Sequence, residues 1–248
     1  MEIISNTTDE KTGGVSHLVT AIKPAVKNEH RVNIFIDDEY SFSLDLAQVV
    51  DIKLKVGQRL SPEKITEYKH LSEFGKLYQR TLEWVLTRPH SERETRDYLK
   101  RKKLRRSAEN RRRISRRQYL KEHPEYRREY ESLKELPEFD KKDMAKVLQM
   151  LLDKQYVDDQ KFTEYYVENR MVKKGISQRR LKQELFKKGI SASVIEQALN
   201  ASDRNDVEEI KKVIQKKRTK YSDEKLIQYL TRQGFDYQTV KSLVCEMD

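Results

Sequence analysis

Apolar residues alternate with polar ones near the start of the chain and recur with a helical period over the rest. Alternation places every second side chain on one face of a strand, so three such stretches predict a three-stranded antiparallel sheet with one polar side. Tyr40, Phe42 and Leu44 are expected to share one face of the third strand, and Pro24 is expected to stop the first. The three stretches are residues 17–22, 31–36 and 40–44.

A helix is expected to close this sheet. Ser61 can act as its N-cap, and Pro62 suits the first helical turn, where a missing N–H costs no hydrogen bond. The helix then carries an apolar stripe at Ile65, Tyr68 and Leu71. Residues 15–72 are therefore predicted to form a small β-rich module, and the polar residues 1–14 a flexible tail.

The remainder is helical, and part of it repeats. The segments that follow Ile176 and Tyr221 match at an offset of 45 residues. In each, a serine can cap a helix, two leucines four apart line its inner face, and a glycine can take the left-handed conformation at its end. The matched pairs are Ser177 with Ser222, Leu181 with Leu226, Leu185 with Leu230, and Gly189 with Gly234.

A third copy is present earlier but is split by an insertion. Ser91 and Leu99 match its first part, Phe139, Met144 and Leu148 match its second, and residues 104–137 lie between. Thr95 stands where a leucine is expected, so this copy is the weakest. Helices this short are unstable alone, so we predict a mainly α fold of three tandem three-helix repeats that form a curved solenoid. The repeats are residues 73–155, 156–203 and 204–248.

Composition restricts the class of protein. Of the 248 residues, 38% are charged and 36% hydrophobic, and no run approaches the ~20 apolar residues that span a bilayer. The start of the chain lacks signal-peptide features, and the single cysteine, Cys245, rules out an internal disulfide. We expect a cytoplasmic protein without membrane contact.

The net charge of +11 is concentrated. Residues 100–135 hold 15 basic and 6 acidic side chains, which favours a polyanionic partner. Arginines can bind phosphates bidentately, and the interleaved tyrosines can stack on bases. Two alternatives stay open: a solvated insertion that keeps the chain soluble, or contact with an acidic protein surface. The nucleic-acid-binding candidates are Arg105, Arg106, Arg111, Arg112, Arg113, Arg116, Arg117, Arg127 and Arg128.

A second basic set surrounds the glycines of the middle repeat. It could meet a protein partner or DNA, or it could simply be the solvated outer face of the helices. The candidates in this set are Lys173, Lys174, Arg179, Arg180, Lys187 and Lys188.

Nothing in the pattern indicates an enzyme. Asp158 or Asp159 is expected to cap a helix, and Asp37 and Asp38 suit a hairpin turn better than a metal site. The five histidines keep no metal-ligand spacing, and neither a phosphate-binding loop nor a nucleophile motif is present. We therefore predict no catalytic residue, no metal and no cofactor.

These motifs resemble the RecX family. The resemblance rests on the serine-capped helix from Ser177 to Leu185, the corner Lys188-Gly189-Ile190, and a helix start at Val157-Asp158-Asp159 followed by Phe162. The β-rich module is similar to the N-terminal extension of RecX proteins from Gram-positive-type bacteria. The resemblance covers about residues 15–248, and the long insertion and Thr95 depart from it.

The resemblance implies a regulator of the RecA recombinase. Such a protein binds RecA filaments along their groove and dampens strand exchange, ATP hydrolysis and co-protease activity, and with them DNA recombination, repair and the SOS response. The expected partners are the RecA filament and DNA, bound by a monomer. A nucleic-acid-binding repeat protein that acts without RecA is the alternative, and a helical adaptor for another protein is a third possibility.

Overall fold

The computed structural model describes residues 16–26, 28–126 and 136–246. The predicted tail, residues 1–14, and two of the candidate arginines, Arg127 and Arg128, lie outside the described residues. The chain divides into two compact units. One contains Met1–Gln79 and Asn110–Phe139, and the other contains Arg80–Glu109 and Asp140–Asp248.

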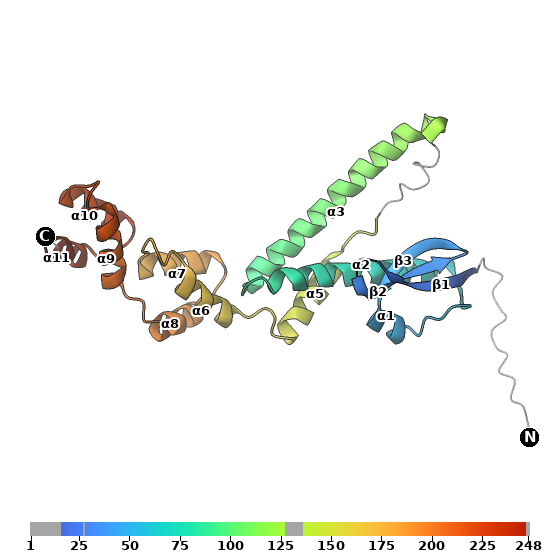
Figure 1. The fold of residues 1–248 in the computed structure, drawn as a ribbon, viewed down its shortest axis with the longest axis horizontal. Helices are drawn as coiled ribbons and strands as arrows, with labels where there is room; N and C mark the ends of the chain where they lie inside the picture. Colours follow the sequence, from blue (N-terminus) through green and yellow to red (C-terminus); the bar gives the residue numbers. More distant parts are fainter. Residues whose placement is uncertain (1–15, 27, 127–135, 247–248) are drawn as a thin grey trace, which may run out of the picture. The chain divides into compact units, whose positions relative to one another are not determined.

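The first unit contains a four-stranded antiparallel sheet in the order β3-β2-β1-β4, and Figure 1 labels its strands β1, β2 and β3. Three of its strands confirm the predicted ones, and the prediction missed the fourth, because a strand of two residues has no periodicity to read. The strands are β1 (His17–Ala25), β2 (Asn28–Ile36), β3 (Glu39–Asp45) and β4 (Arg59–Leu60).

The prediction that Pro24 stops the first strand is wrong. Strand β1 continues to Ala25, and Pro24 lies opposite Val32 of β2. Strand β4 pairs with β1 only at His17 and Leu18. Pro24 therefore lies where β1 is an edge strand, and an edge strand tolerates a residue without an N–H.

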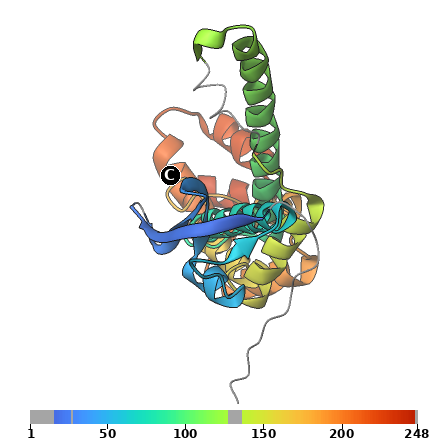
Figure 2. The same cartoon turned by 90° about the vertical axis from the view of Figure 1, so that its right-hand side faces the viewer.

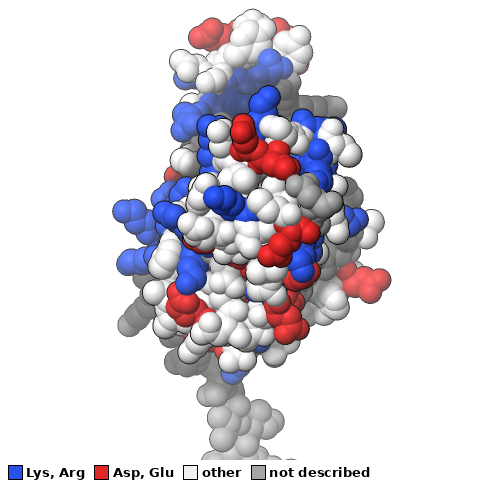
Figure 3. Space-filling view, turned by 90° about the vertical axis from the view of Figure 1, so that its left-hand side faces the viewer, with Lys and Arg blue, Asp and Glu red and all other residues white. Residues whose placement is uncertain are grey.

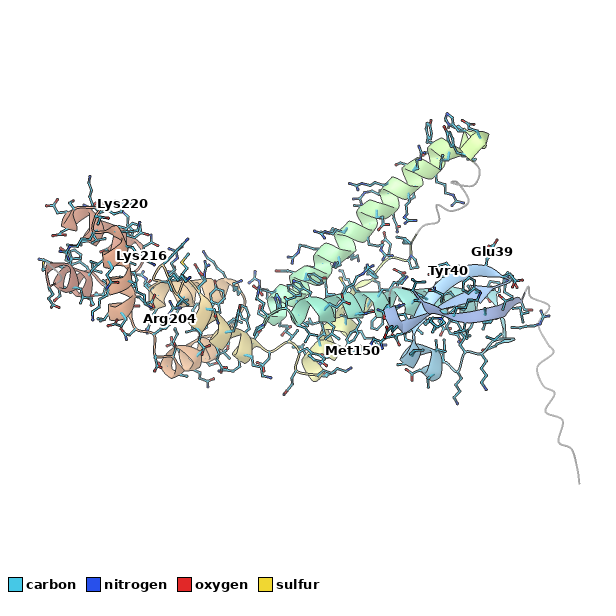
Figure 4. The ribbon with its side chains drawn as sticks, viewed as in Figure 1. Glu39, Tyr40, Met150, Arg204, Lys216 and Lys220 are labelled. Atoms are coloured by element: carbon cyan, nitrogen blue, oxygen red, sulfur yellow. The ribbon has the colours of Figure 1, made fainter. Side chains whose placement is uncertain are left out.

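The predicted hairpin turn is confirmed, since Asp37 and Asp38 both have positive φ, 49° and 66°. The expectation that Tyr40 shares a face with Phe42 is wrong. The register between β2 and β3 shifts near Phe35, so the alternation changes phase. Phe42 is consequently buried, whereas Tyr40 is 56% exposed and packs edge-on against the ring of Phe35. Figure 4 labels Tyr40 at this hairpin.

Helices α1 (Leu46–Asp51) and α2 (Pro62–Val85) complete this part of the fold. The Ser61 hydroxyl accepts the Lys64 N–H at 3.4 Å, as its predicted capping role requires. Ile65 and Tyr68 are buried against the apolar face of the sheet, and Leu71 packs beside them, so the closing helix is confirmed. Helix α2 does not end near residue 72 but runs on to Val85.

The insertion begins as a continuation of helix α3 (Glu92–Lys121), which is uninterrupted (Figure 2). A short 3₁₀ helix, η1 (Pro124–Tyr126), follows it. Asn110 fixes the returning chain, because its side-chain amide accepts the Leu136 N–H at 3.0 Å and donates to the Leu136 carbonyl at 2.8 Å.

The second unit contains the repeats, which confirms the predicted fold of tandem three-helix units after an antiparallel sheet. The middle repeat buries Leu181 and Leu185, and the last repeat buries the matching Leu226 and Leu230. The helices of the unit are the start of α3 with α5 (Lys141–Asp153), then α6 (Asp159–Asn169), α7 (Gln178–Lys187) and α8 (Ala192–Ala201), then α9 (Asp206–Lys217), α10 (Asp223–Arg232) and α11 (Tyr237–Glu246).

The predicted glycine corners are also confirmed. Gly189 ends α7 with φ +85° and Gly234 ends α10 with φ +92°, a region that other residues enter only with strain. After α7, the Ile190 N–H donates to the Leu185 carbonyl and the Gly189 N–H to the Phe186 carbonyl. This pattern is the Schellman motif, which satisfies the last carbonyls of a helix.

Candidate nucleic-acid and partner interface

Consecutive repeats are joined by the serines that cap their middle helices. The Ser91 hydroxyl accepts the Glu94 N–H and donates to the Lys188 carbonyl of the next repeat at 3.3 Å. The Ser177 hydroxyl likewise donates to the Gln233 carbonyl at 2.7 Å. Both serines are fully buried. Ser222, which matches them in the last repeat, is exposed and makes no side-chain capping bond.

An aspartate reinforces each junction. Asp159 accepts the Glu92 N–H at 2.8 Å, and Asp206 accepts the Gln178 N–H at 2.8 Å. Burial raises the pKa of both carboxyl groups. Asp158, in contrast, caps α6 by accepting two of its N–H groups, as the sequence predicts for one member of this pair. The two neighbouring aspartates therefore have separate structural roles.

An arginine, Arg204, makes additional contacts across the second junction. The Arg204 guanidinium donates to the Val167 carbonyl at 2.5 Å and the Arg170 carbonyl at 2.8 Å, and it pairs with Glu209 at 2.9 Å. Glu209 is buried and also accepts the Ile176 N–H. Burial opposes ionisation of Glu209, but Arg204 and Lys212 outweigh it and lower its pKa. Figure 4 labels Arg204, which lies in the segment between α8 and α9.

Glu94 holds the first junction together. Its carboxylate lies 2.5 Å from Lys188 Nζ, 3.0 Å from Arg88 Nη1 and 3.0 Å from His90 Nδ1. Burial opposes ionisation of Glu94, but these three partners outweigh it and hold its pKa at about 2. The Lys188 ammonium also lies 5.7 Å from the ring centre of Phe162. Lys188, one of the candidate contact residues, is therefore occupied within the protein.

Glu184 has the same function inside the middle repeat. It accepts hydrogen bonds from the Tyr166 hydroxyl at 2.6 Å and Arg170 Nε at 2.7 Å, and it pairs with Arg180 at 3.3 Å. These bonds overcome the effect of burial and lower the pKa of Glu184 to about 2, while burial and Glu184 raise that of Tyr166 to about 12. Arg180 also binds the Gln233 side chain of the next repeat. The candidate Arg180 is thus largely structural.

The other four candidates of this set are exposed. Lys173 and Lys174 lie in the turn after α6, Arg179 lies in the first turn of α7, and Lys187 lies at the end of α7. Lys216 and Lys220 project at and just beyond the end of α9 (Figure 4). Figure 3 looks onto the left-hand side of the view in Figure 1 and shows Lys and Arg side chains spread over that face, with Asp and Glu among them.

The candidate arginines of the insertion lie along α3. Arg106 is only 8% exposed, so the prediction that it faces a nucleic acid needs correction: its side chain is covered by the fold. Arg113 is half-buried. The Arg116 guanidinium lies over the Tyr119 ring at 5.1 Å. The exposed candidates are Arg105, Arg111, Arg112, Arg116 and Arg117.

Arg232 is a basic residue that the sequence did not single out. It lies at the end of α10 and lines a crevice of about 350 Å³ together with Arg179 and Arg180. The two helices come from different repeats, so spacing along one helix could not reveal this pairing. The repeat offset of 45 residues was the available signal, since it matches Arg232 with the candidate Lys187.

Neither a cluster of metal-ligating side chains nor a membrane-spanning helix is present among the described residues. They contain no group of three or more His, Cys, Asp or Glu side chains placed to hold a metal ion. No helix in the described part of the chain has the length and apolar character needed to cross a membrane.

The fold and these surfaces define a class: a tandem helical-repeat protein with capped corners, preceded by a small antiparallel sheet and carrying exposed cations. Comparisons with known proteins point to one family. The model of the regulatory protein RecX N-terminal domain matches residues 17–61, and that of the second three-helix domain of RecX matches residues 158–199. The chain is therefore similar to the RecX family of regulatory proteins in both of these stretches.

Curated relatives match along nearly the whole chain. The regulatory protein RecX of Bacillus licheniformis is 27% identical, over 93% of this chain and 77% of the relative. That of Bacillus subtilis is 28% identical, with the same shares covered. A crystal structure of a regulatory protein RecX has the same fold, with a TM-score of 0.60 at 20% identity, and it covers 92% of this chain and 98% of its own.

Proposed function

We propose that this protein binds RecA filaments and inhibits their recombinase, ATPase and co-protease activities, and so modulates DNA repair and recombination. The observation that carries the proposal is the match to RecX regulatory proteins over 93% of the chain. The names of these relatives describe a regulator, and regulation by binding needs no catalytic residue in the chain.

Occupancy of the filament groove accounts for the inhibition physically. Tandem repeats present the same corner more than once, so one chain can engage more than one protomer of a helical filament. The exposed cations of α3 and of the middle repeat are available for the DNA inside such a filament. A chain bound in the groove blocks strand exchange and hinders the subunit motions that accompany ATP hydrolysis.

The test measures ATP hydrolysis by RecA on single-stranded DNA, with this protein added at increasing ratios to RecA. We expect hydrolysis to fall in a dose-dependent manner and to approach its minimum below one chain per RecA protomer, because each chain covers several protomers. Unchanged hydrolysis at a stoichiometric dose contradicts the proposal. RecA without DNA is the baseline.

The exposed arginines of α3 favour a second candidate function: nucleic-acid binding that does not depend on RecA. The two functions separate in one pair of assays. A protein that binds DNA tightly but leaves RecA hydrolysis unchanged fits the second function, whereas inhibition at salt concentrations that abolish binding to free DNA fits the first.

A further inference from the structure

Each of the two junctions between repeats has a crevice of about 350 Å³ beside its corner glycine. In the first crevice, Arg93 of α3 lies beside the corner Gly189. In the second, Arg179 of α7 lies beside the corner Gly234. The fold therefore supplies an internal comparison, because both crevices lie at a repeat junction beside a corner glycine but are otherwise lined by different residues.

The charges of the first crevice are balanced. Its basic side chains are accompanied by carboxylates, with Arg96 paired to Glu92 and Lys100 Nζ lying 3.4 Å from an Asp97 oxygen. These exposed pairs neutralise one another and leave little attraction for an external anion. The charged side chains that line this crevice are Glu92, Arg93, Arg96, Asp97, Lys100 and Asp159.

The second crevice is lined by arginines and by neutral residues, without a carboxylate among its described lining. Arg180 is committed to Glu184 and Gln233. Arg179 and Arg232 are exposed, and in the described part of the chain neither forms an ion pair or a hydrogen bond. Two unpaired guanidinium groups that share one crevice repel each other, and a bound anion removes that repulsion.

A phosphate group suits this arrangement. Two guanidinium groups offer planar, forked donors that match the oxygens of one phosphate, and Gln183 and Thr231 add neutral polar groups to the lining. The exposed Lys173, Lys174 and Lys187 belong to the same repeat as Arg179, so further cations are available to a long polyanion.

We propose that the crevice formed by Arg179 and Arg232, between α7 and α10, binds a backbone phosphate of single-stranded nucleic acid. The proposal rests on the proposed function only in its choice of nucleic acid, because a filament regulator works where single-stranded DNA is present. The first crevice, with its balanced charges, does not share this role.

The experiment compares two double variants of the full-length protein with the wild type. Arg179→Gln with Arg232→Gln removes the unpaired cations, and Arg96→Gln with Lys100→Gln removes two paired cations from the first crevice. All four side chains are exposed, so both variants should fold, which unfolding curves verify. Binding to a fluorescent single-stranded oligonucleotide is measured by anisotropy over a salt series, without RecA.

For Arg179→Gln with Arg232→Gln we expect affinity at low salt to fall about tenfold and the salt slope to decrease by about 0.7, which corresponds to one lost single-strand phosphate contact. The paired-cation control should change affinity no more than about twofold. Unchanged affinity and slope in the first variant, or an equal loss in both variants, overturns the proposal.

RecA hydrolysis measured with the same variants separates this proposal from the proposed function. If the crevice variant loses inhibition but binds free DNA normally, the crevice meets an acidic protein surface and the nucleic-acid proposal is wrong. If the wild type never inhibits RecA but its DNA binding depends on the crevice, the proposed function is wrong and the crevice proposal stands.

Discussion

Among single residues, the partly buried carboxylates form ion pairs that hold the repeats together. Glu94 accepts charge-assisted hydrogen bonds from Lys188, Arg88 and His90, and these partners lie both in its own repeat and in the next. A buried carboxylate stabilises a fold only where such partners offset its desolvation. The pKa of about 2 indicates that they more than offset it here.

We predict that Glu94→Gln lowers the free energy of unfolding at neutral pH by about 1–3 kcal/mol, the range for hydrogen bonds to charged groups. Because the folded pKa is depressed, the contribution of Glu94 is fully present above its ordinary value of 4.5 and is lost as the pH falls from there toward 2. Urea unfolding at several pH values should show the gap between variant and wild type closing in acid.

The control for this prediction is Glu208→Gln. Glu208 also pairs with a lysine, Lys211, but both side chains are exposed. Exposed pairs contribute little, so the variant should stay within about 0.5 kcal/mol of the wild type. A gap for Glu94→Gln that does not depend on pH would contradict the predicted role of the ionised carboxylate.

Among the elements, the start of each middle helix determines how one repeat meets the next. The serine there caps its own helix and donates to the end of the equivalent helix in the following repeat. The aspartate of the following repeat then binds the first N–H of the helix. The corner glycine permits this close approach, because a Cβ on Gly234 would lie 2.9 Å from the Ser177 hydroxyl.

The three serines permit a matched prediction. Ser177→Ala removes a cap and an inter-repeat hydrogen bond from a buried site, so it should lower the free energy of unfolding by about 1–2 kcal/mol. Ser222→Ala changes the same position of the repeat at an exposed site without a side-chain capping bond, and its effect should stay within about 0.5 kcal/mol. Denaturant midpoints of the two variants test the difference, and equal losses would show that the inter-repeat bond contributes nothing.

In the whole molecule, charge is distributed far from evenly. The chain carries +11 overall, and residues 100–135 alone hold an excess of nine basic side chains. Much of this excess lies on exposed positions of α3. A concentration of exposed cations attracts polyanions from a distance and makes association sensitive to salt.

We predict that Arg105→Gln, Arg111→Gln and Arg112→Gln together reduce the salt slope of DNA binding by about 2–3, since each lost phosphate contact contributes about 0.7–0.9. These three residues are exposed, so folding should be unaffected. The matched control replaces three exposed cations that already have carboxylate partners, Arg96, Lys100 and Lys211, by glutamine. If the salt slope of DNA binding stays the same in the first variant, these three arginines belong to a solvated surface that does not contact DNA.

The sequence by itself determined the elements of this protein and their repetition. Alternating residues defined three strands, and the offset of 45 residues paired Ser177 with Ser222 and Gly189 with Gly234. These features could be read because they depend on local periodicity and on backbone conformations that few residues adopt.

Only the tertiary structure decided which cations are free. In the sequence, Arg106, Arg180 and Lys188 are as basic as Arg105 and Arg179. The fold, however, covers Arg106, pairs Arg180 with Glu184, and pairs Lys188 with Glu94. Arg232 lies beside Arg179 only because α10 packs against α7 across the repeat junction. Pairing depends on distances between distant segments, and no periodicity along the chain encodes those distances.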